Sequence, residues 1–234
     1  MKTSPEWLYL EEGVGVDYLD PEVAGNYDDQ HQKFRDFEEE AQDIVDKLNI
    51  VPEDTVLDFG CGTGGIALEL AGRCRKVIGV DISQSMLEVL RKKCRESGIN
   101  NIETHCAGFL SYQHEGGPVD KMVSKVALHH LPDFWKSIAL LNMASILKKG
   151  GKLYLFDVVY TFKAPDYEDS LENLVETLRK QAGDTMAHET ITHIRDEYST
   201  YDWVMEGLLK SCGFSVDSKT VEAENYVTYI CSKG

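Results

Sequence analysis

Thr55–Leu70, with the sequence TVLDFGCGTGGIALEL, is the most informative stretch of this chain. An apolar run ends at Asp58, a glycine-rich loop follows, and a helical pattern of apolar residues begins at Ile66. This order predicts a buried strand, a tight turn and a helix, which open a nucleotide-binding α/β sheet. Glycine allows a positive φ and a close approach of the backbone to a ligand, because it has no Cβ.

The glycine loop fits two ligand classes. Gly60, Gly62 and Gly65 have the G-x-G-x-x-G spacing of dinucleotide-binding loops. The same loop fits an acid-x-Gly-x-Gly pattern in which Asp58 ends the strand. A pyrophosphate at a helix N-terminus needs positive potential, and a carboxylate just before the first glycine opposes it. S-adenosylmethionine (SAM) carries an ammonium and a sulfonium but no phosphate, so Asp58 favours SAM over NAD(P).

A second acid indicates an adenosine site. Val77–Asp81, VIGVD, is an apolar strand that ends in a carboxylate. It stands about 20 residues past the glycines, where an acid that binds ribose hydroxyls is expected. SAM and NAD(P) both contain a ribose, so Asp81 fits either cofactor. A purely structural alternative is that Asp81 caps the next helix.

Length and charge restrict the possible partners. The chain has 234 residues, enough for one domain with a full core. Its net charge of −16 disfavours nucleic acid as a partner. We expect a cytoplasmic protein without a membrane partner, because no apolar run reaches the ~20 residues of a membrane span and the N-terminus does not resemble a signal peptide. The cysteines are scattered without a C-x-x-C pair, which favours buried free thiols.

Strand-like and helix-like segments alternate after the glycine loop. We expect strands near 102–105, 119–124 and 152–160, with helices near 83–97 and 134–147 between them. This alternation predicts an α/β fold, a Rossmann-like doubly wound sheet that is mostly parallel. Two final β-prone runs, 214–221 and 226–231, have a connection too short for a parallel crossover. They predict a C-terminal antiparallel hairpin, seven strands in all, which is not the plan of a dinucleotide dehydrogenase.

The rest of the chain belongs to the same single domain, residues 1–234. Residues 1–26 show no clear period and predict an irregular arm, and an amphipathic pattern predicts a helix over 31–48. Residues 161–198 are polar and helix-prone, so we expect a helical insert that forms a substrate lid over the carboxyl ends of the strands. His188 and His193 in this insert do not share a helical face, and we therefore expect no metal site.

Several motifs together resemble those of one family. They are VLDFGCGTG (56–64), VIGVDIS (77–83), ALHHLPD (127–133), LKKGGKLYLFDVV (147–159) and the step Asn26-Tyr27-Asp28. With them the chain resembles the class I SAM-dependent methyltransferases, in particular their small-molecule branch of type 11/25. The resemblance runs from Tyr27 to the C-terminus and is weakest over 161–198. It implies transfer of a methyl group from SAM to a small-molecule acceptor by in-line displacement.

The resemblance also implies the residues that bind SAM, namely Tyr27, Arg35, Asp58, Gly60, Cys61, Gly62, Asp81, Ile82, Met86, Gly108, Phe109, Ser124 and Lys125. Among them, Asp58 would meet the methionine amino group and Asp81 both ribose hydroxyls. Ile82 and Met86 would sandwich the adenine. Arg35 would meet the methionine carboxylate, unless it is a plain surface charge of the helix.

Gly108 departs from the pattern of that family. Many relatives have an acid there, which accepts a hydrogen bond from the adenine amino group, whereas this chain reads CAGFLSY. The backbone N–H of Gly108 or Phe109 can still meet the adenine ring. The resemblance therefore predicts SAM binding weakened by ~1 kcal/mol, the value of one lost hydrogen bond.

Methyl transfer from a sulfonium depends mainly on positioning and desolvation. A base is needed only if the acceptor arrives protonated, and His129 and His130 are the candidates for that proton transfer. Alternatively, these histidines only shape their loop through hydrogen bonds. Two other functions stay open from the sequence: an NAD(P)-dependent oxidoreductase, and a SAM-binding protein without turnover.

Overall fold

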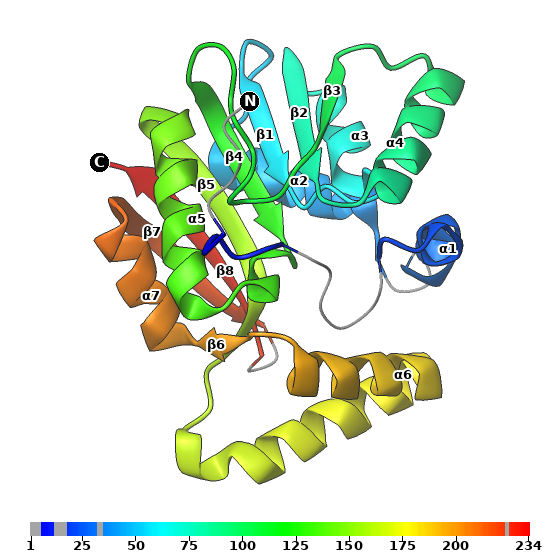
Figure 1. Cartoon of the computed structure of the whole chain (residues 1–234), viewed down its shortest axis with the longest axis vertical. Helices are drawn as coiled ribbons and strands as arrows, with labels where there is room; N and C mark the ends of the chain where they lie inside the picture. Colours follow the sequence, from blue (N-terminus) through cyan, green and yellow to red (C-terminus); the bar gives the residue numbers. More distant parts are fainter. Residues whose placement is uncertain (1–5, 12–17, 32–34, 223–224) are drawn as a thin grey trace.

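The computed structural model describes residues 6–11, 18–31, 35–222 and 225–234. The elements shown in Figure 1 are, in chain order, α1 (Pro21–His31), α2 (Phe37–Leu48), β1 (Thr55–Phe59), α3 (Gly65–Ala71), β2 (Lys76–Asp81), α4 (Gln84–Ser97), β3 (Ile102–Cys106), β4 (Val119–Lys125), the 3₁₀ helix η1 (Leu128–His130), α5 (Asp133–Ile146), β5 (Leu147–Tyr160), the 3₁₀ helix η2 (Ala164–Asp166), α6 (Tyr167–Asp196), β6 (Thr200–Tyr201), α7 (Asp202–Ser211), β7 (Phe214–Glu222) and β8 (Tyr226–Lys233).

The strands form one mixed sheet in the order β3-β2-β1-β4-β5-β8-β7. Strands β1 to β5 pair in parallel, whereas β8 runs antiparallel to both β5 and β7. The predicted α/β fold, mostly parallel with a C-terminal antiparallel hairpin, is confirmed. Strand β6 was not predicted: its two residues pair in parallel with the end of β5.

Helices cover both faces of the sheet. On one face, Ile44 and Leu48 of α2 and Leu70 of α3 pack against Val56 and Val77 of the central strands. On the other face, α5 and α7 cover the sheet with apolar side chains that include Leu140, Met143 and Leu209. Burial of each such side chain stabilises the fold by about 1.5–3 kcal/mol. All six cysteines are free thiols.

The N-terminal region differs from its prediction at two points. The helix expected over 31–48 begins only at Phe37, because the Asp36 side chain caps it by accepting from the N–H groups of Glu38 and Glu39 at 3.1 Å. The arm expected to be irregular contains α1, whose sequence has little helical periodicity. Residues 1–5, 12–17 and 32–34 lie outside the described part of the chain.

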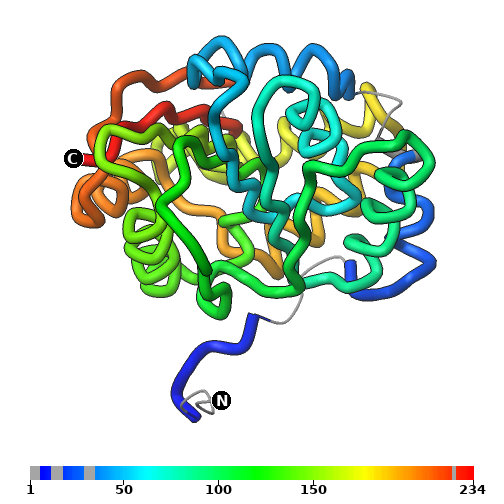
Figure 2. The backbone as a smooth tube through the Cα atoms, turned by 90° about the horizontal axis from the view of Figure 1, so that it is seen from above, coloured from blue at the N-terminus to red at the C-terminus, as the bar shows by residue number. Residues whose placement is uncertain are grey.

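Contacts with the domain hold α1 and the arm in place. The Ser83 hydroxyl donates to the Tyr18 carbonyl at 2.7 Å, and Thr63 of the glycine loop donates to Asp28 of α1 at 2.6 Å. The described arm residues 6–11 lie at the outer edge of the molecule, on a different side from the C-terminus (Figure 2). Tertiary contacts therefore stabilise a segment that local sequence preference does not.

Helix α6 occupies most of the segment expected as an insert. It is two helices joined at Gly183, whose φ of +88° breaks the helical path. Both halves lie below the sheet in Figure 1, beyond the ends of the strands. Within the described ranges, each helix is too short or too polar to span a lipid bilayer.

Candidate active site

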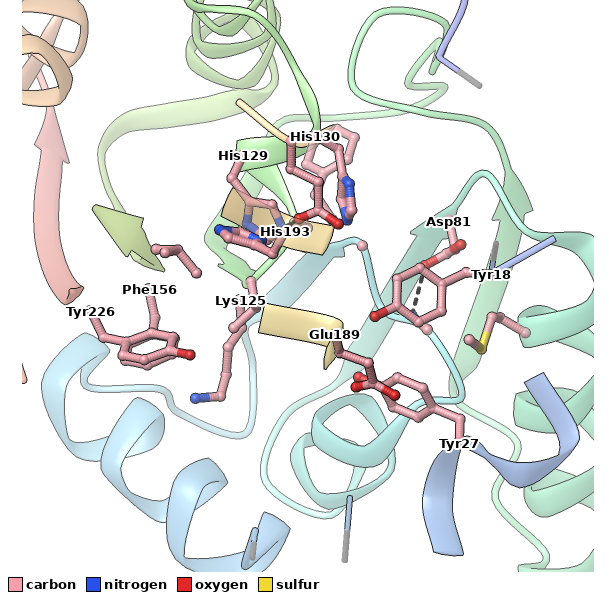
Figure 3. Close-up of a pocket in the computed structure, with 18 of the residues that line it drawn as sticks. Tyr18, Tyr27, Asp81, Lys125, His129, His130, Phe156, Glu189, His193 and Tyr226 are labelled. Atoms are coloured by element: carbon pink, nitrogen blue, oxygen red, sulfur yellow. Dashed lines mark hydrogen bonds and ion pairs between the residues drawn. The ribbon is translucent and has the colours of Figure 1, made fainter. Parts of the chain in front are cut away.

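A cavity of about 660 Å³ lies at the carboxyl ends of the strands, within the size range of small-molecule sites. Its walls come from the ends of β1, β2, β4 and β5, from the loop after β3, and from α1 and α6. Figure 3 shows side chains from these separate elements pointing into one space. The cavity therefore joins the glycine loop to the inner side of α6.

Two glycines of the loop, Gly60 and Gly62, line the cavity and differ in what a side chain there would meet. Gly60 has a φ of +73°, and a Cβ there would lie 2.3 Å from the Cβ of Ala127. Gly62 has a φ of +52° and lines the cavity, and a Cβ there would meet nothing within 4 Å. The absent side chain at Gly62 thus leaves open space for a ligand.

The N–H groups at the start of this loop are already used. Gly60 and Cys61 both donate to the carbonyl of Val80, at 2.8 and 3.2 Å. Cys61 does not line the cavity; its side chain packs with Leu87 and Leu90. A ligand can therefore meet Gly60 and Gly62 in the cavity, but the described geometry does not bring Cys61 to it.

Asp81 lies in the cavity wall with both carboxylate oxygens held. Its Oδ2 accepts from the Gly62 N–H and its Oδ1 from the Ser83 N–H, each at 2.8 Å. Ser83, not Asp81, is the cap of α4, because its hydroxyl accepts from the Met86 N–H at 3.1 Å. Each oxygen of Asp81 retains a lone pair for a ligand hydroxyl. Burial raises the pKa of Asp81.

Asp58 lies beneath the loop and is only 3% exposed. It is not part of the cavity wall, so any effect on a ligand acts through its charge. Burial, and secondarily the negative charge of Asp81, raise the pKa of Asp58 to about 7, against a smaller opposite effect of Arg35. Asp58 and Asp81 therefore place acids beside the cavity side of the glycine loop, which suits a cationic ligand and not a pyrophosphate. Asp28 also contacts the loop but is paired with Lys93.

Two cations line the part of the cavity near α2. Arg35 donates to both oxygens of Glu40, at 3.0 and 2.6 Å, and Lys125 is 3.5 Å from Glu40. The Lys125 ammonium also lies 3.7 Å from the ring centre of Phe156, as Figure 3 illustrates. Arg35 is thus a cavity residue and not a plain surface charge. Burial lowers the pKa of Lys125, partly offset by Glu40.

Ser124, which precedes Lys125, lies outside the cavity wall. It is fully buried, and its hydroxyl has no hydrogen-bond partner among the described residues. Tyr27, by contrast, lines the cavity together with Tyr18, and the two rings meet edge to face at 5.9 Å. The structure therefore brings most of the predicted residues together but leaves out the side chains of Asp58, Cys61 and Ser124.

An arm residue that sequence reasoning missed lies at Gly108. Ile82, Met86, Gly108 and Phe109 line one part of the cavity, and Glu11 lies beside them. A Cβ on Gly108 would be 2.3–2.4 Å from the carboxyl atoms of Glu11. The Glu11 carboxyl group therefore occupies the space in which a side chain at position 108 would lie. No local pattern could have revealed this contact between distant parts of the chain.

Glu11 also binds the loop as a helix-capping acid would. Its Oε2 accepts from the N–H groups of Leu110 and Ser111, at 2.9 and 3.2 Å, and from the Ser111 hydroxyl at 3.2 Å. An Asp at position 108 would reach the same two N–H groups as an N-cap. Burial raises the pKa of Glu11, against the opposing effect of these hydrogen bonds.

Histidines and acids form a cluster at another part of the cavity. The Nδ1 of His129 lies 2.5 Å from Asp157, and its Nε2 lies 3.1 Å from Glu197 at the end of α6. His193 also contacts Glu197 through Nδ1. The Nδ1 of His130 is buried without a hydrogen-bond partner among the described residues. Figure 3 shows His129, His130 and His193 close together.

The pKa values of the two adjacent histidines are shifted in opposite directions. Burial alone lowers the pKa of His129, but the charges and hydrogen bonds of Asp157 and Glu197 outweigh it and raise the pKa to about 9. Burial and the neighbouring His129 lower the pKa of His130 to about 4. Asp157, His193 and Glu197 were not among the predicted site residues, although Asp157 stands out as an acid inside the apolar run of β5.

Comparison with known proteins agrees with this geometry. A family model described as a methyltransferase domain matches residues 56–151. An uncharacterized methyltransferase of Geobacillus sp. strain WCH70 is 28% identical over 201 residues, which cover 86% of each protein. A SAM-dependent methyltransferase structure from Clostridium acetobutylicum has a TM-score of 0.68 at 15% identity, covering 91% of this chain and 98% of that one. A geranyl diphosphate methyltransferase in complex with SAM has a TM-score of 0.66 at 14% identity, covering 92% of each chain.

The matched domain, the relatives and the shared fold support a class I SAM-dependent methyltransferase, an enzyme whose cofactor is SAM. This confirms the prediction that SAM is the cofactor and disfavours the NAD(P)-dependent oxidoreductase. The residues present fit the cofactor, because the loop leaves open space at Gly62 and has acids beside it.

Proposed function

We propose that this enzyme methylates a small molecule held between the strand ends and α6. The observation that carries the proposal is the single cavity shared by Gly62, Asp81 and the inner residues of α6. SAM carries the methyl group on its sulfonium sulfur. When the methyl group is transferred, the rest of the cofactor leaves as a neutral thioether. The chain has to hold both molecules in line and keep water out.

Within this proposal, the cofactor residues have separate tasks. Asp81 accepts from the ribose hydroxyls, and Ile82, Met86 and Phe109 hold the adenine. Glu11 accepts from the adenine amino group, a contact that would otherwise be missing at Gly108. These assignments rest on the position of each side chain in the cavity wall.

The methionine end of SAM carries both charges, and the cavity offers a partner for each. We assign the carboxylate to Arg35 and Lys125, the two cations beside Glu40. We assign the ammonium and sulfonium to the negative potential of Asp58 and Asp81. Backbone atoms of Gly60 and Gly62 complete the contact, with Tyr27 closing the pocket above them.

The wall of the acceptor region favours a neutral or cationic molecule with an apolar body. Helix α6 contributes Leu174, Leu178 and Met186, and aromatic rings come from Tyr18, Phe156 and Tyr226. Over the whole cavity wall, acidic residues outnumber the Arg and Lys side chains: they are Glu11, Glu40, Asp81, Glu189, Glu197 and Glu222, of which Glu189 and Glu197 come from α6 and its end. An anionic acceptor would meet net repulsion there.

A protein base has little part in the proposed reaction. Both ring nitrogens of His129 face carboxylates, so no lone pair is available to an acceptor. His130 has a low pKa of about 4 and is a weak proton acceptor. We therefore propose that His129 and His130 shape the acceptor region, while positioning and desolvation accelerate the transfer.

The test uses SAM with a tritiated methyl group and fractions of a metabolite extract. We expect label to enter small molecules and not protein or nucleic acid. Isothermal titration calorimetry with S-adenosylhomocysteine (SAH), the demethylated product of SAM, serves as the control for the cofactor site. Binding of SAH without label transfer to any fraction would favour a SAM-binding protein without turnover.

A further inference from the structure

We propose that His129, His130 and Glu197 form a binding site for a divalent transition-metal ion at the acceptor region of the cavity. One ligand atom from each residue lies within 4.8 Å of the others. The expectation of no metal rested on His188 and His193, and this site is built from other residues. His129 and His130 belong to η1, whereas Glu197 follows α6, so an ion here would join α6 to the body of the domain.

The distances already suit coordination. The Nε2 of His129 and the Oε2 of Glu197 are 3.1 Å apart. Two ligands at 2.0–2.2 Å from one ion are separated by roughly 3.0–3.4 Å, for octahedral to tetrahedral angles. This pair therefore needs almost no movement, and only His130 has to turn toward them.

Asp157 fixes His129 in the orientation that a metal requires. It is fully buried and lies against Nδ1 of His129, and it also accepts from the N–H groups of His129 and Val158. The ring then presents Nε2 toward Glu197, and a metal ion that binds this nitrogen has to displace to solvent the proton that Nε2 shares with Glu197. A carboxylate on the far nitrogen is the usual companion of a metal-bound histidine.

His130 gives a second, independent observation. The centres of the His129 and His130 rings are 4.4 Å apart. The Nδ1 of His130 is buried and has no hydrogen-bond partner among the described residues. Buried polar atoms are normally satisfied, so this unpartnered nitrogen indicates a missing partner. A metal ion would take the lone pair that no described donor takes.

The donor set indicates which ions the site would take. Two imidazole nitrogens and one carboxylate suit Zn²⁺ and its first-row neighbours better than Mg²⁺ or Ca²⁺, which prefer oxygen ligands. His193 contacts the same carboxylate and would hold Glu197 in place. Coordination positions not taken by the protein would face the cavity. An oxygen or nitrogen of the methyl acceptor would bind the ion there, an inference that rests on the proposed function.

Co²⁺ added to the metal-free full-length protein is the direct test, because its visible absorption reports coordination. We expect one equivalent to bind with intense bands, and Zn²⁺ to displace it. His130→Ala and Glu197→Gln should each weaken binding by at least ~10-fold. His188→Ala is the matched control, because it removes an exposed histidine of α6 outside the cavity wall, and it should change nothing.

The outcomes separate this proposal from the cofactor site. Titration of SAH into each variant checks that the domain is folded, since none of these side chains is assigned to SAM. Absence of Co²⁺ binding, or binding that neither variant weakens, would show that the cluster is only a buried network of hydrogen bonds. Azide should bind to coordination positions that the protein leaves open and so shift the spectrum of the Co²⁺ form. An unchanged spectrum would contradict the inference that such positions face the cavity.

Discussion

Removal of the Glu11 carboxylate should weaken cofactor binding selectively at the adenine. A hydrogen bond to a charged group contributes about 1.5–3 kcal/mol. Glu11 already accepts from Leu110 and Ser111, so the lower value applies, which corresponds to roughly tenfold in affinity. Glu11→Ala should therefore bind SAH about tenfold more weakly than the unchanged protein, as measured by titration calorimetry.

An altered ligand distinguishes a contact with adenine from a general loosening of the loop. S-inosylhomocysteine has an oxygen where SAH has the amino group, and a carboxylate cannot accept from it. The unchanged protein should discriminate against this analogue by about tenfold, and Glu11→Ala should not discriminate. An equal loss of affinity for both ligands would refute the assignment to the amino group.

A second substitution can restore the acid from the other side. Gly108 has ordinary backbone angles, but a side chain there would collide with Glu11. In the Glu11→Ala background that space is empty, and Gly108→Asp would place a carboxylate on the same loop. The double variant should recover most of the affinity for SAH, while Gly108→Asp alone should lose affinity. An SAH affinity of Glu11→Ala within twofold of that of the unchanged protein would show that Glu11 does not bind the cofactor.

The other predictions concern the acids and glycines of the cofactor loop. Asp81→Ala should weaken SAM binding by more than ~100-fold, with the circular dichroism spectrum unchanged, because two charge-assisted hydrogen bonds to the ribose are lost; retention of affinity within twofold would contradict the assignment. The pKa of Asp58 is raised from 3.8 to about 7, so SAM, which favours the ionised form, should bind more tightly as pH rises from 6 to 8, and Asp58→Asn should bind without that dependence. The same raised pKa means that the free protein loses stability as pH rises from about 4 to 7, which thermal unfolding of both proteins would measure. Gly60→Ala should lower the unfolding temperature because of its contact with Ala127, whereas Gly62→Val should mainly weaken SAH binding; the reverse pattern would contradict the roles of the two glycines.

The sheet could be predicted because its information is local. β1, β2 and the second half of β5 are apolar runs beside a glycine or an acid, whereas β3 and β4 were predicted from the alternation of strands with helices. The short link between β7 and β8 allows only an antiparallel pair. The helix α1 could not be predicted in the same way, since its stability comes from contacts such as Thr63 with Asp28. Strand β6 is likewise too short for any periodicity.

The candidate site divides along the same line. Asp81 ends β2, Ile82 follows it and Met86 lies in the first turn of α4, so their places in the cavity follow from the topology of the sheet. Glu11 and Glu197 reach the cavity from the arm and from the end of α6, and no spacing along the chain reveals a contact over such separations. Residues at or just after the ends of strands were therefore predictable. Residues from the arm and from the end of α6, the two segments that cover the cavity, were not.

These two covering acids have a common consequence for the enzyme. Glu11 supplies a carboxylate to the loop after β3, and Glu197 supplies one to His129 in the loop after β4. Each loop lacks an acid of its own for that contact, so it is complete only when its covering segment is in place. Under the proposed assignments, a ligand that binds either carboxylate also contacts a segment that lies over the cavity. Cofactor at one part of the cavity and acceptor or metal at the other would thus each fasten a different segment of the chain over the same space.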